Sequence, residues 1–131
     1  MKRLFVIQLG VACVLVSLSQ AAEHTKDSLK AVKENVDSKK AVLVDVREKS
    51  EWQDGHVEGA ISMPLSELKA GIEEKELAKR LPKGKIVYTH CVAGKRSLEA
   101  ATILEKHGYD LRPLKPGYKE LLEGGFKKAK E

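Results

Sequence analysis

Runs of apolar residues alternate with amphipathic polar segments from about residue 27 onward. The apolar runs are short and rich in valine and isoleucine, which is typical of strands covered on both faces. They lie at residues 41–46, 60–63, 85–90 and, more weakly, 111–114. The polar segments between them show helical spacing of apolar residues or a serine that can cap a helix. These predicted helices lie at residues 27–35, 50–53, 66–81, 97–107 and 117–123.

This alternation predicts an α/β fold. Strands that alternate with helices favour a mainly parallel central sheet, here of about five short strands, with helices on both faces. Ligands of such sheets bind at the carboxyl ends of the strands, where Asp45 and Cys91 both stand. No internal repeat or linker interrupts the pattern, so we expect residues 22–131 to form a single domain.

The first 21 residues show a different pattern, that of a secretory signal peptide. A basic start at residues 2–3 precedes an almost uninterrupted apolar run over residues 4–18, and residues 19–21 include the small residues that signal cleavage requires. The run is shorter than the roughly 20 residues of a membrane span. We expect cleavage after Ala21 and export of the mature chain, most simply to the periplasm. After cleavage we expect no stable membrane insertion. A retained anchor and lipid attachment at Cys13 are the alternatives.

Charge and cysteine content narrow the classes of function. The chain has 24 Lys and Arg against 19 Asp and Glu, and removal of residues 1–21 leaves 22 against 19, a net charge of +3. This excess is small and the basic residues lack interleaved aromatic residues, so we expect no nucleic-acid partner. Cys13 leaves with the signal peptide, so Cys91 has no partner for an internal disulfide.

Cys91 is a candidate nucleophile because of what surrounds it in the sequence. It stands between the strand at 85–90 and a helix expected to open at Ser97, where backbone N–H groups lack helical partners and the helix dipole adds partial positive charge. Lys95 and Arg96 add two full positive charges. Such surroundings favour the thiolate form of a cysteine. A buried, purely structural cysteine is the alternative.

Three segments resemble the rhodanese homology domain family, and in particular its small exported single-domain members of the periplasmic phage-shock type. They are residues 43–52, residues 55–64 and the loop Cys91–Ser97, and the resemblance extends over about residues 38–126. It implies a thiosulfate sulfurtransferase that works through a persulfide on Cys91. The thiolate would take sulfane sulfur from a small anionic donor such as thiosulfate and pass it to a thiophilic acceptor, cyanide or a thiol. No cofactor is implied.

The resemblance also implies roles for the residues around Cys91. Backbone N–H groups of the loop would bind the donor and then the persulfide, and the loop residues are Val92, Ala93, Gly94, Lys95, Arg96 and Ser97. The Lys95 and Arg96 side chains would attract thiosulfate. Asp45 and Arg47 would brace the end of the sheet, a direct contact of Arg47 with the substrate being the alternative. Because thiolate attack on sulfur moves no proton when sulfite leaves, we expect His90 to pack rather than act as a base. We expect no metal site, since no second His or Cys stands at ligand spacing from His56.

Two departures from the family pattern and two rival functions stand beside this interpretation. Val92 occupies a position where many members have arginine, and Lys115-Pro116-Gly117-Tyr118 replaces a glycine pair near the active site. A cysteine-dependent phosphatase or arsenate reductase is one rival, but only four residues separate Cys91 from Arg96, whereas the phosphatase loop has five. A non-enzymatic sulfur-carrier or binding module is the other.

Overall fold

A four-stranded parallel sheet forms the centre of the molecule in the computed structural model, which describes Gly10 and residues 22–131. The order is β2-β1-β3-β4, and each neighbouring pair runs parallel. The strands are β1 (Ala41–Asp45), β2 (Ile61–Ser62), β3 (Ile86–His90) and β4 (Asp110–Pro113). The α/β fold with a parallel sheet is therefore confirmed, although residues 22–131 hold four strands rather than about five. The predicted signal peptide lies outside the described residues, apart from Gly10.

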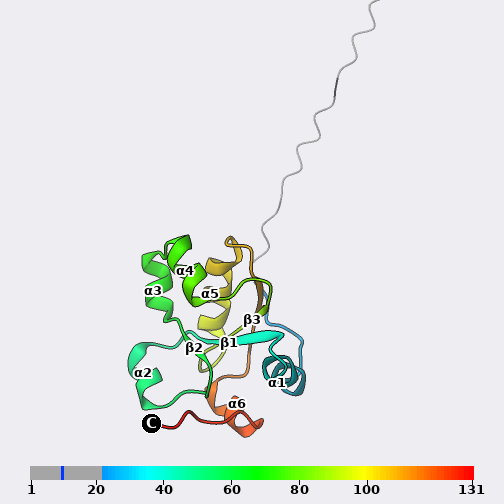
Figure 1. The fold of residues 1–131 in the computed structure, drawn as a ribbon, viewed down its shortest axis with the longest axis vertical. Coiled ribbons are helices and arrows are strands. Elements are labelled where there is room, and N and C mark those ends of the chain that lie inside the picture. Colours follow the sequence, from blue (N-terminus) through cyan, green and yellow to red (C-terminus); the bar gives the residue numbers. More distant parts are fainter. Residues whose placement is uncertain (1–9, 11–21) are drawn as a thin grey trace, which may run out of the picture.

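Six helices surround the sheet within residues 22–131 and cover both of its faces, as the alternation predicted. Figure 1 shows α3, α4 and α5 on one side of the strands and α1 and α6 on the other. The helices are α1 (Leu29–Asp37), α2 (Lys49–Asp54), α3 (Leu65–Ala70), α4 (Glu74–Arg80), α5 (Lys95–Glu105) and α6 (Tyr118–Glu123).

Each face of the sheet has its own hydrophobic core. Successive strand residues point to opposite faces, so Val44 and Val87 pack beneath α3, α4 and α5, whereas Leu43 and Tyr88 pack against α1 and α6. All four side chains are at most 2% exposed. Because both faces of the sheet are buried, the strands are continuous apolar runs without strict alternation of apolar and polar residues. This continuity is the feature that predicted them as strands.

Three helices begin before the serines that the sequence analysis gave as helix starts, which are Ser50, Ser66 and Ser97. In α2 the cap is a box formed by Glu48 and Glu51, so this helix begins one residue early. In α5 the N-cap is Gly94 in the left-handed conformation, with φ 93°, and no side chain caps the helix. The first N–H groups of α5 therefore stay available at the Cys91 loop.

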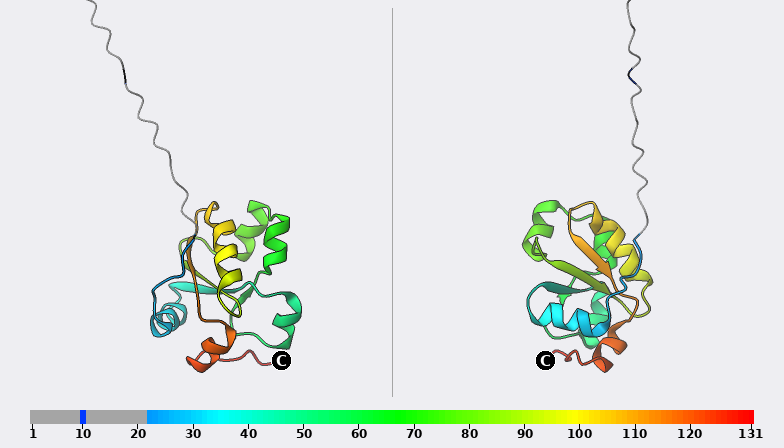
Figure 2. Two further views of the ribbon diagram at one scale, coloured as in Figure 1. Left: turned by 180° about the vertical axis from the view of Figure 1, so that it is seen from behind. Right: turned by 90° about the vertical axis from the view of Figure 1, so that its right-hand side faces the viewer.

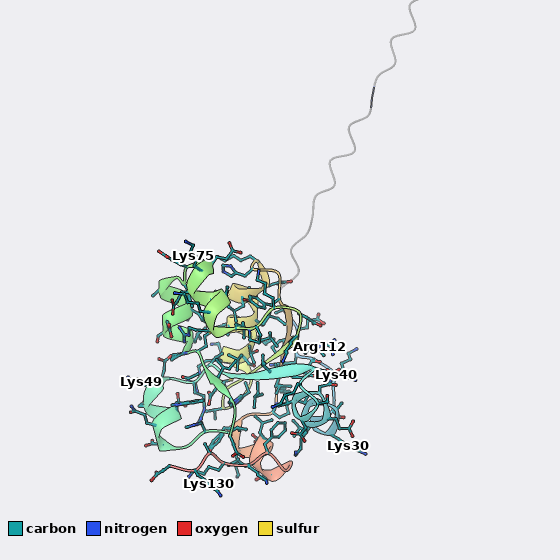
Figure 3. The ribbon with its side chains drawn as sticks, in the orientation of Figure 1. Lys30, Lys40, Lys49, Lys75, Arg112 and Lys130 are labelled. Carbon is teal, nitrogen blue, oxygen red and sulfur yellow. The ribbon has the colours of Figure 1, made fainter. Side chains whose placement is uncertain are left out.

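Basic side chains are spread around the outline of the molecule. Figure 3 labels Lys30 on α1, Lys40 before β1, Lys49 on α2, Lys75 on α4 and Lys130 near the C-terminus, and each projects outward from a different place. No helix formed by residues 22–131 is both long enough and apolar enough to cross a membrane.

Candidate active site

Cys91 and Asp45 lie at the same edge of the sheet. Asp45 of β1 is in register with His90 of β3, so both strands end side by side, and Cys91 follows immediately. The Cys91 side chain is 1% exposed, and the Gly94 N–H donates a hydrogen bond to its Sγ over 3.1 Å. An N–H aimed at sulfur, beside the uncapped start of α5, is an arrangement that stabilises negative charge.

The loop residues divide into an exposed tip and a buried base. Val92, 54% exposed, lies at the tip together with Ala93 and Lys95, which are also exposed. Ser97 is fully buried, and its Oγ lies 2.8 Å from the Gly94 carbonyl oxygen and 2.7 Å from the Leu114 carbonyl oxygen. The Ser97 hydroxyl thus fastens the base of the loop to the segment after β4.

Arg96 is held by a carboxylate rather than directed at open space. Its two terminal nitrogens donate to the two oxygens of Glu51, over 2.6 and 3.0 Å. Glu51 raises the pKa of Arg96, and Arg96 in turn lowers the pKa of Glu51. Arg96 therefore joins α5 to α2, whereas the sequence led us to expect that its side chain would attract thiosulfate. Lys95, by contrast, takes part in no ion pair within residues 22–131.

Asp45 and Arg47 form a buried ion pair at the end of β1. The Arg47 backbone N–H and Nε each donate to Asp45 Oδ1 over 3.0 Å, and Nη2 donates to Oδ2 over 2.8 Å. Nη2 also donates to the Gly55 carbonyl oxygen over 2.8 Å, and the guanidinium lies 4.2 Å from the centre of the Tyr118 ring. Arg47 thus connects β1, the end of α2 and the start of α6, a geometry that suits the bracing role expected for this pair.

His90 is enclosed beside this ion pair. Its Nε2 lies 3.7 Å from Asp45 Oδ2, and neither ring nitrogen has a hydrogen-bond partner among the described residues. Burial lowers the pKa of His90 to about 4, with Asp45 opposing and Arg47 adding to the shift. His90 is therefore neutral at neutral pH, in keeping with a packing role.

The turn at residues 115–118 closes against the active-site loop. A Cβ on Gly117 would lie 2.0 Å from the Val92 carbonyl oxygen and 2.8 Å from that of Cys91, so only glycine allows this approach. The Tyr118 N–H donates to the Cys91 carbonyl oxygen over 2.9 Å. Beside the loop lies a shallow depression of about 460 Å³, lined by Leu29, Val92, Ala93, Lys115, Pro116 and Glu120. The sequence marked this turn only as a departure from the family pattern, whereas the structure adds the cation of Lys115 at its edge.

His56 supports the turn after α2. Its Nδ1 lies 3.0 Å from the Trp52 carbonyl oxygen, and its ring stacks on the Trp52 indole with centroids 3.6 Å apart. Trp52 is half-buried in this stack rather than part of either core. Residues 22–131 contain no group of three or more His, Cys, Asp or Glu placed to hold a metal ion.

Comparison with known proteins agrees with this architecture. The chain is 40% identical to YqhL, an uncharacterized protein of Bacillus subtilis, over 94 residues that make up 71% of this chain and 68% of YqhL. It is 39% identical to the thiosulfate sulfurtransferase PspE of Escherichia coli over 67 residues, which are 50% of this chain and 60% of PspE. The human single-domain sulfurtransferase TSTD1 superimposes with a TM-score of 0.64 at 29% identity, over 78% of this chain and 96% of that one.

The family assignment rests on a match that covers nearly all of the described fold. The profile of the rhodanese-like domain matches residues 28–130, from the N-cap of α1 to the residue before the last. This span contains every strand and helix described above, together with the Cys91 loop and the turn that closes on it. The chain therefore belongs to the family of rhodanese-like domains.

Proposed function

We propose that the protein is a thiosulfate sulfurtransferase that carries sulfane sulfur as a persulfide on Cys91. The observation that carries this proposal is the 3.1 Å hydrogen bond from the Gly94 N–H to Sγ at the uncapped start of α5. Such a donor stabilises the negative charge of a thiolate, and it stabilises the terminal sulfur of a persulfide in the same way. Membership of the family and the similarity to PspE support the same chemistry.

The first half-reaction transfers one sulfur atom. The Cys91 thiolate attacks the outer sulfur of thiosulfate, an S–S bond forms between the enzyme and that sulfur, and the S–S bond of thiosulfate breaks. Sulfite leaves with the bonding electron pair, so the charge of the reactants is conserved in the persulfide anion and sulfite. No proton moves in this step, so the reaction needs no general base and is compatible with a neutral His90 beside Cys91.

The second half-reaction regenerates the thiolate. A nucleophilic acceptor, cyanide or the thiolate of a small thiol, attacks the outer sulfur of the persulfide, and the S–S bond to Cys91 breaks with its electron pair returning to Sγ. The products are thiocyanate or an acceptor persulfide. Because Cys91 is 1% exposed, we expect small donors and acceptors to react faster than large ones.

Charge at the loop favours an anionic donor. Lys95 is exposed and has no carboxylate partner within residues 22–131. The helix dipole of α5 places further partial positive charge at the same end. Arg96 contributes less to anion binding than its place in the sequence indicated, because Glu51 occupies both of its terminal nitrogens.

The same ion pair argues against phosphate-ester hydrolysis. A phosphatase of this general kind needs an arginine that grips the phosphate with two parallel hydrogen bonds. Here the two terminal nitrogens of Arg96 already bind Glu51. We therefore expect negligible turnover of p-nitrophenyl phosphate under conditions in which thiosulfate is consumed.

Steady-state kinetics with thiosulfate and cyanide test the proposal. Wild-type protein should release thiocyanate and sulfite in equal amounts, and Cys91→Ala, with an unchanged circular dichroism spectrum, should release neither. Thiocyanate formation by Cys91→Ala would contradict the mechanism. A wild-type protein that forms the persulfide but passes it to neither cyanide nor thiols would instead be a sulfur carrier.

The place of the reaction is a separate part of the proposal. The signal-like pattern of residues 1–21 supports export, and we propose the periplasm as the compartment. Fractionation of cells that express the full-length chain tests it: processed protein in the periplasmic fraction is the expected result, and full-length protein in the cytosolic fraction would contradict it.

A further inference from the structure

The segment before α1 lies against the active-site region. The Thr25 N–H donates to the Pro113 carbonyl oxygen over 2.8 Å, which fixes this segment beside the end of β4. Both views in Figure 2 show the segment, in blue, running alongside the orange chain of β4 before it enters α1. One residue earlier, His24 is half-buried, and its Nε2 lies 2.7 Å from the Gly94 carbonyl oxygen. Residues 70 positions apart thus meet at the base of the Cys91 loop.

The direction of the hydrogen bond follows from its acceptor. A carbonyl oxygen only accepts, so the proton lies on His24 Nε2. The same oxygen also receives the Ser97 hydroxyl over 2.8 Å and the Leu98 N–H over 3.4 Å. His24 is the contact that comes from outside the loop and its helix.

The orientation of this carbonyl determines where the next N–H points. In a planar trans peptide the C=O of Gly94 and the N–H of Lys95 point in opposite directions. The bond from Leu98 shows that the Gly94 carbonyl points along α5, so the Lys95 N–H points out of the start of the helix, toward the loop that holds Cys91. A contact that holds the carbonyl therefore also holds this N–H.

Gly94 is enclosed as well as hydrogen-bonded. A Cβ at this position would lie 2.8 Å from His24 Nε2 and 3.1 Å from the Lys115 Cα. His24 on one side and the 115–118 turn on the other leave the left-handed backbone of Gly94 little room to move. The Gly94 N–H that donates to Cys91 Sγ belongs to this same restrained residue.

We propose that His24 is a positioning residue for sulfur transfer: its bond to the Gly94 carbonyl restrains Gly94, whose own N–H donates to Cys91 Sγ, and keeps the Lys95 N–H directed out of the start of α5. The inference rests on the proposed function. It assigns a role to a residue that lies before the first helix and outside the Cys91–Ser97 loop.

Three variants test the role. His24→Ala removes the donor, and His24→Gln places an amide N–H close to the position of Nε2. His107→Ala is a control on another half-buried histidine, in the turn that follows α5. Two quantities are measured for each: kcat/KM for thiosulfate, and the rate constant for alkylation of Cys91 by iodoacetamide at neutral pH. Because unfolding exposes Cys91 and would raise its alkylation rate, both quantities are measured under conditions in which circular dichroism shows each variant to be folded.

We expect His24→Ala to lower both quantities about three- to tenfold, the factor that corresponds to one net hydrogen bond. His24→Gln and His107→Ala should stay close to wild type. If His24→Ala does not fold, His24→Asn, whose shorter amide does not reach Gly94, takes its place.

Two results would overturn the role of His24: an unchanged alkylation rate constant in His24→Ala, or a loss in His24→Gln as large as that in His24→Ala. The two proposals fail separately. Absence of thiocyanate formation by wild-type protein would refute sulfur transfer to cyanide, while the alkylation rates would still decide whether His24 positions the loop.

Discussion

Acid should destabilise this protein through one buried histidine. His90 is fully buried with no hydrogen-bond partner for either ring nitrogen among the described residues, and burial lowers its pKa from 6.5 to about 4. The unfolded chain therefore binds a proton at His90 between these two pH values, whereas the folded protein does not. The contribution of a neutral His90 to the free energy of unfolding is therefore present above about pH 6.5 and is lost as the pH falls toward 4.

The size of the effect follows from the difference between the two pKa values. A shift of this size changes the free energy of unfolding by about 2 kcal/mol between pH 7 and pH 5, and by about 3 kcal/mol between pH 7 and pH 4. Carboxylates of the protein also titrate in this range. The contribution of His90 is therefore isolated by subtracting the curve of His90→Phe, which keeps an aromatic ring in the same space and cannot bind a proton.

Urea unfolding at several pH values, followed by fluorescence of the chain's single tryptophan, Trp52, measures this difference. The stability of wild type relative to His90→Phe should fall by about 2 kcal/mol from pH 7 to pH 5. Parallel curves for wild type and His90→Phe would show that His90 is not kept neutral by burial, and the reasoning would be refuted.

Three further predictions concern the loop and its supports. Lys95→Ala should raise the thiosulfate KM several-fold with little change in kcat, and the effect should shrink in high salt because an exposed charge is screened; a salt-independent effect would contradict this. Arg96→Ala and Glu51→Ala should each cost about 1 kcal/mol in urea unfolding, since the pair is partly exposed, and the double variant should cost less than the sum; strict additivity would contradict the pairing. Gly117→Ala should lower kcat/KM by more than about tenfold, because its Cβ would displace the Val92 carbonyl. As a control, Gly59→Ala, whose Cβ meets no neighbour within 4 Å, should lose stability and keep its activity. Equal activity in the two variants would show that a Cβ at position 117 does not disturb the active-site loop.

The strands were predictable because burial on both faces leaves a local signature. The apolar runs at 41–46 and 85–90 correspond to β1 and β3 within one residue. The run at 60–63 shortened to a two-residue β2, since Pro64 follows and lacks the N–H that would extend the ladder. No segment of residues 22–131 supplied the further strand that the sequence analysis allowed for.

Helix starts and side-chain pairings were harder to predict because they depend on residues distant in the sequence. Arg96 was expected to face an anionic donor, but the fold brings Glu51, 45 positions earlier, against it. His24 gave no signal at all, since its contact with Gly94 exists only once the segment before α1 lies beside β4. Gly117 stood out in the sequence only as a departure from the family pattern. The structure explains why glycine is needed there, since a Cβ at this position would lie 2.0 Å from the Val92 carbonyl oxygen.

The central claim is that Cys91 carries sulfur, and intact mass spectrometry tests it most directly. Purified protein is treated with thiosulfate, freed of small molecules and weighed beside Cys91→Ala treated in the same way. The account predicts that wild type gains the mass of one sulfur atom, that cyanide removes this mass with release of thiocyanate, and that Cys91→Ala gains nothing. An unchanged mass in wild type, or an equal gain in Cys91→Ala, would contradict it.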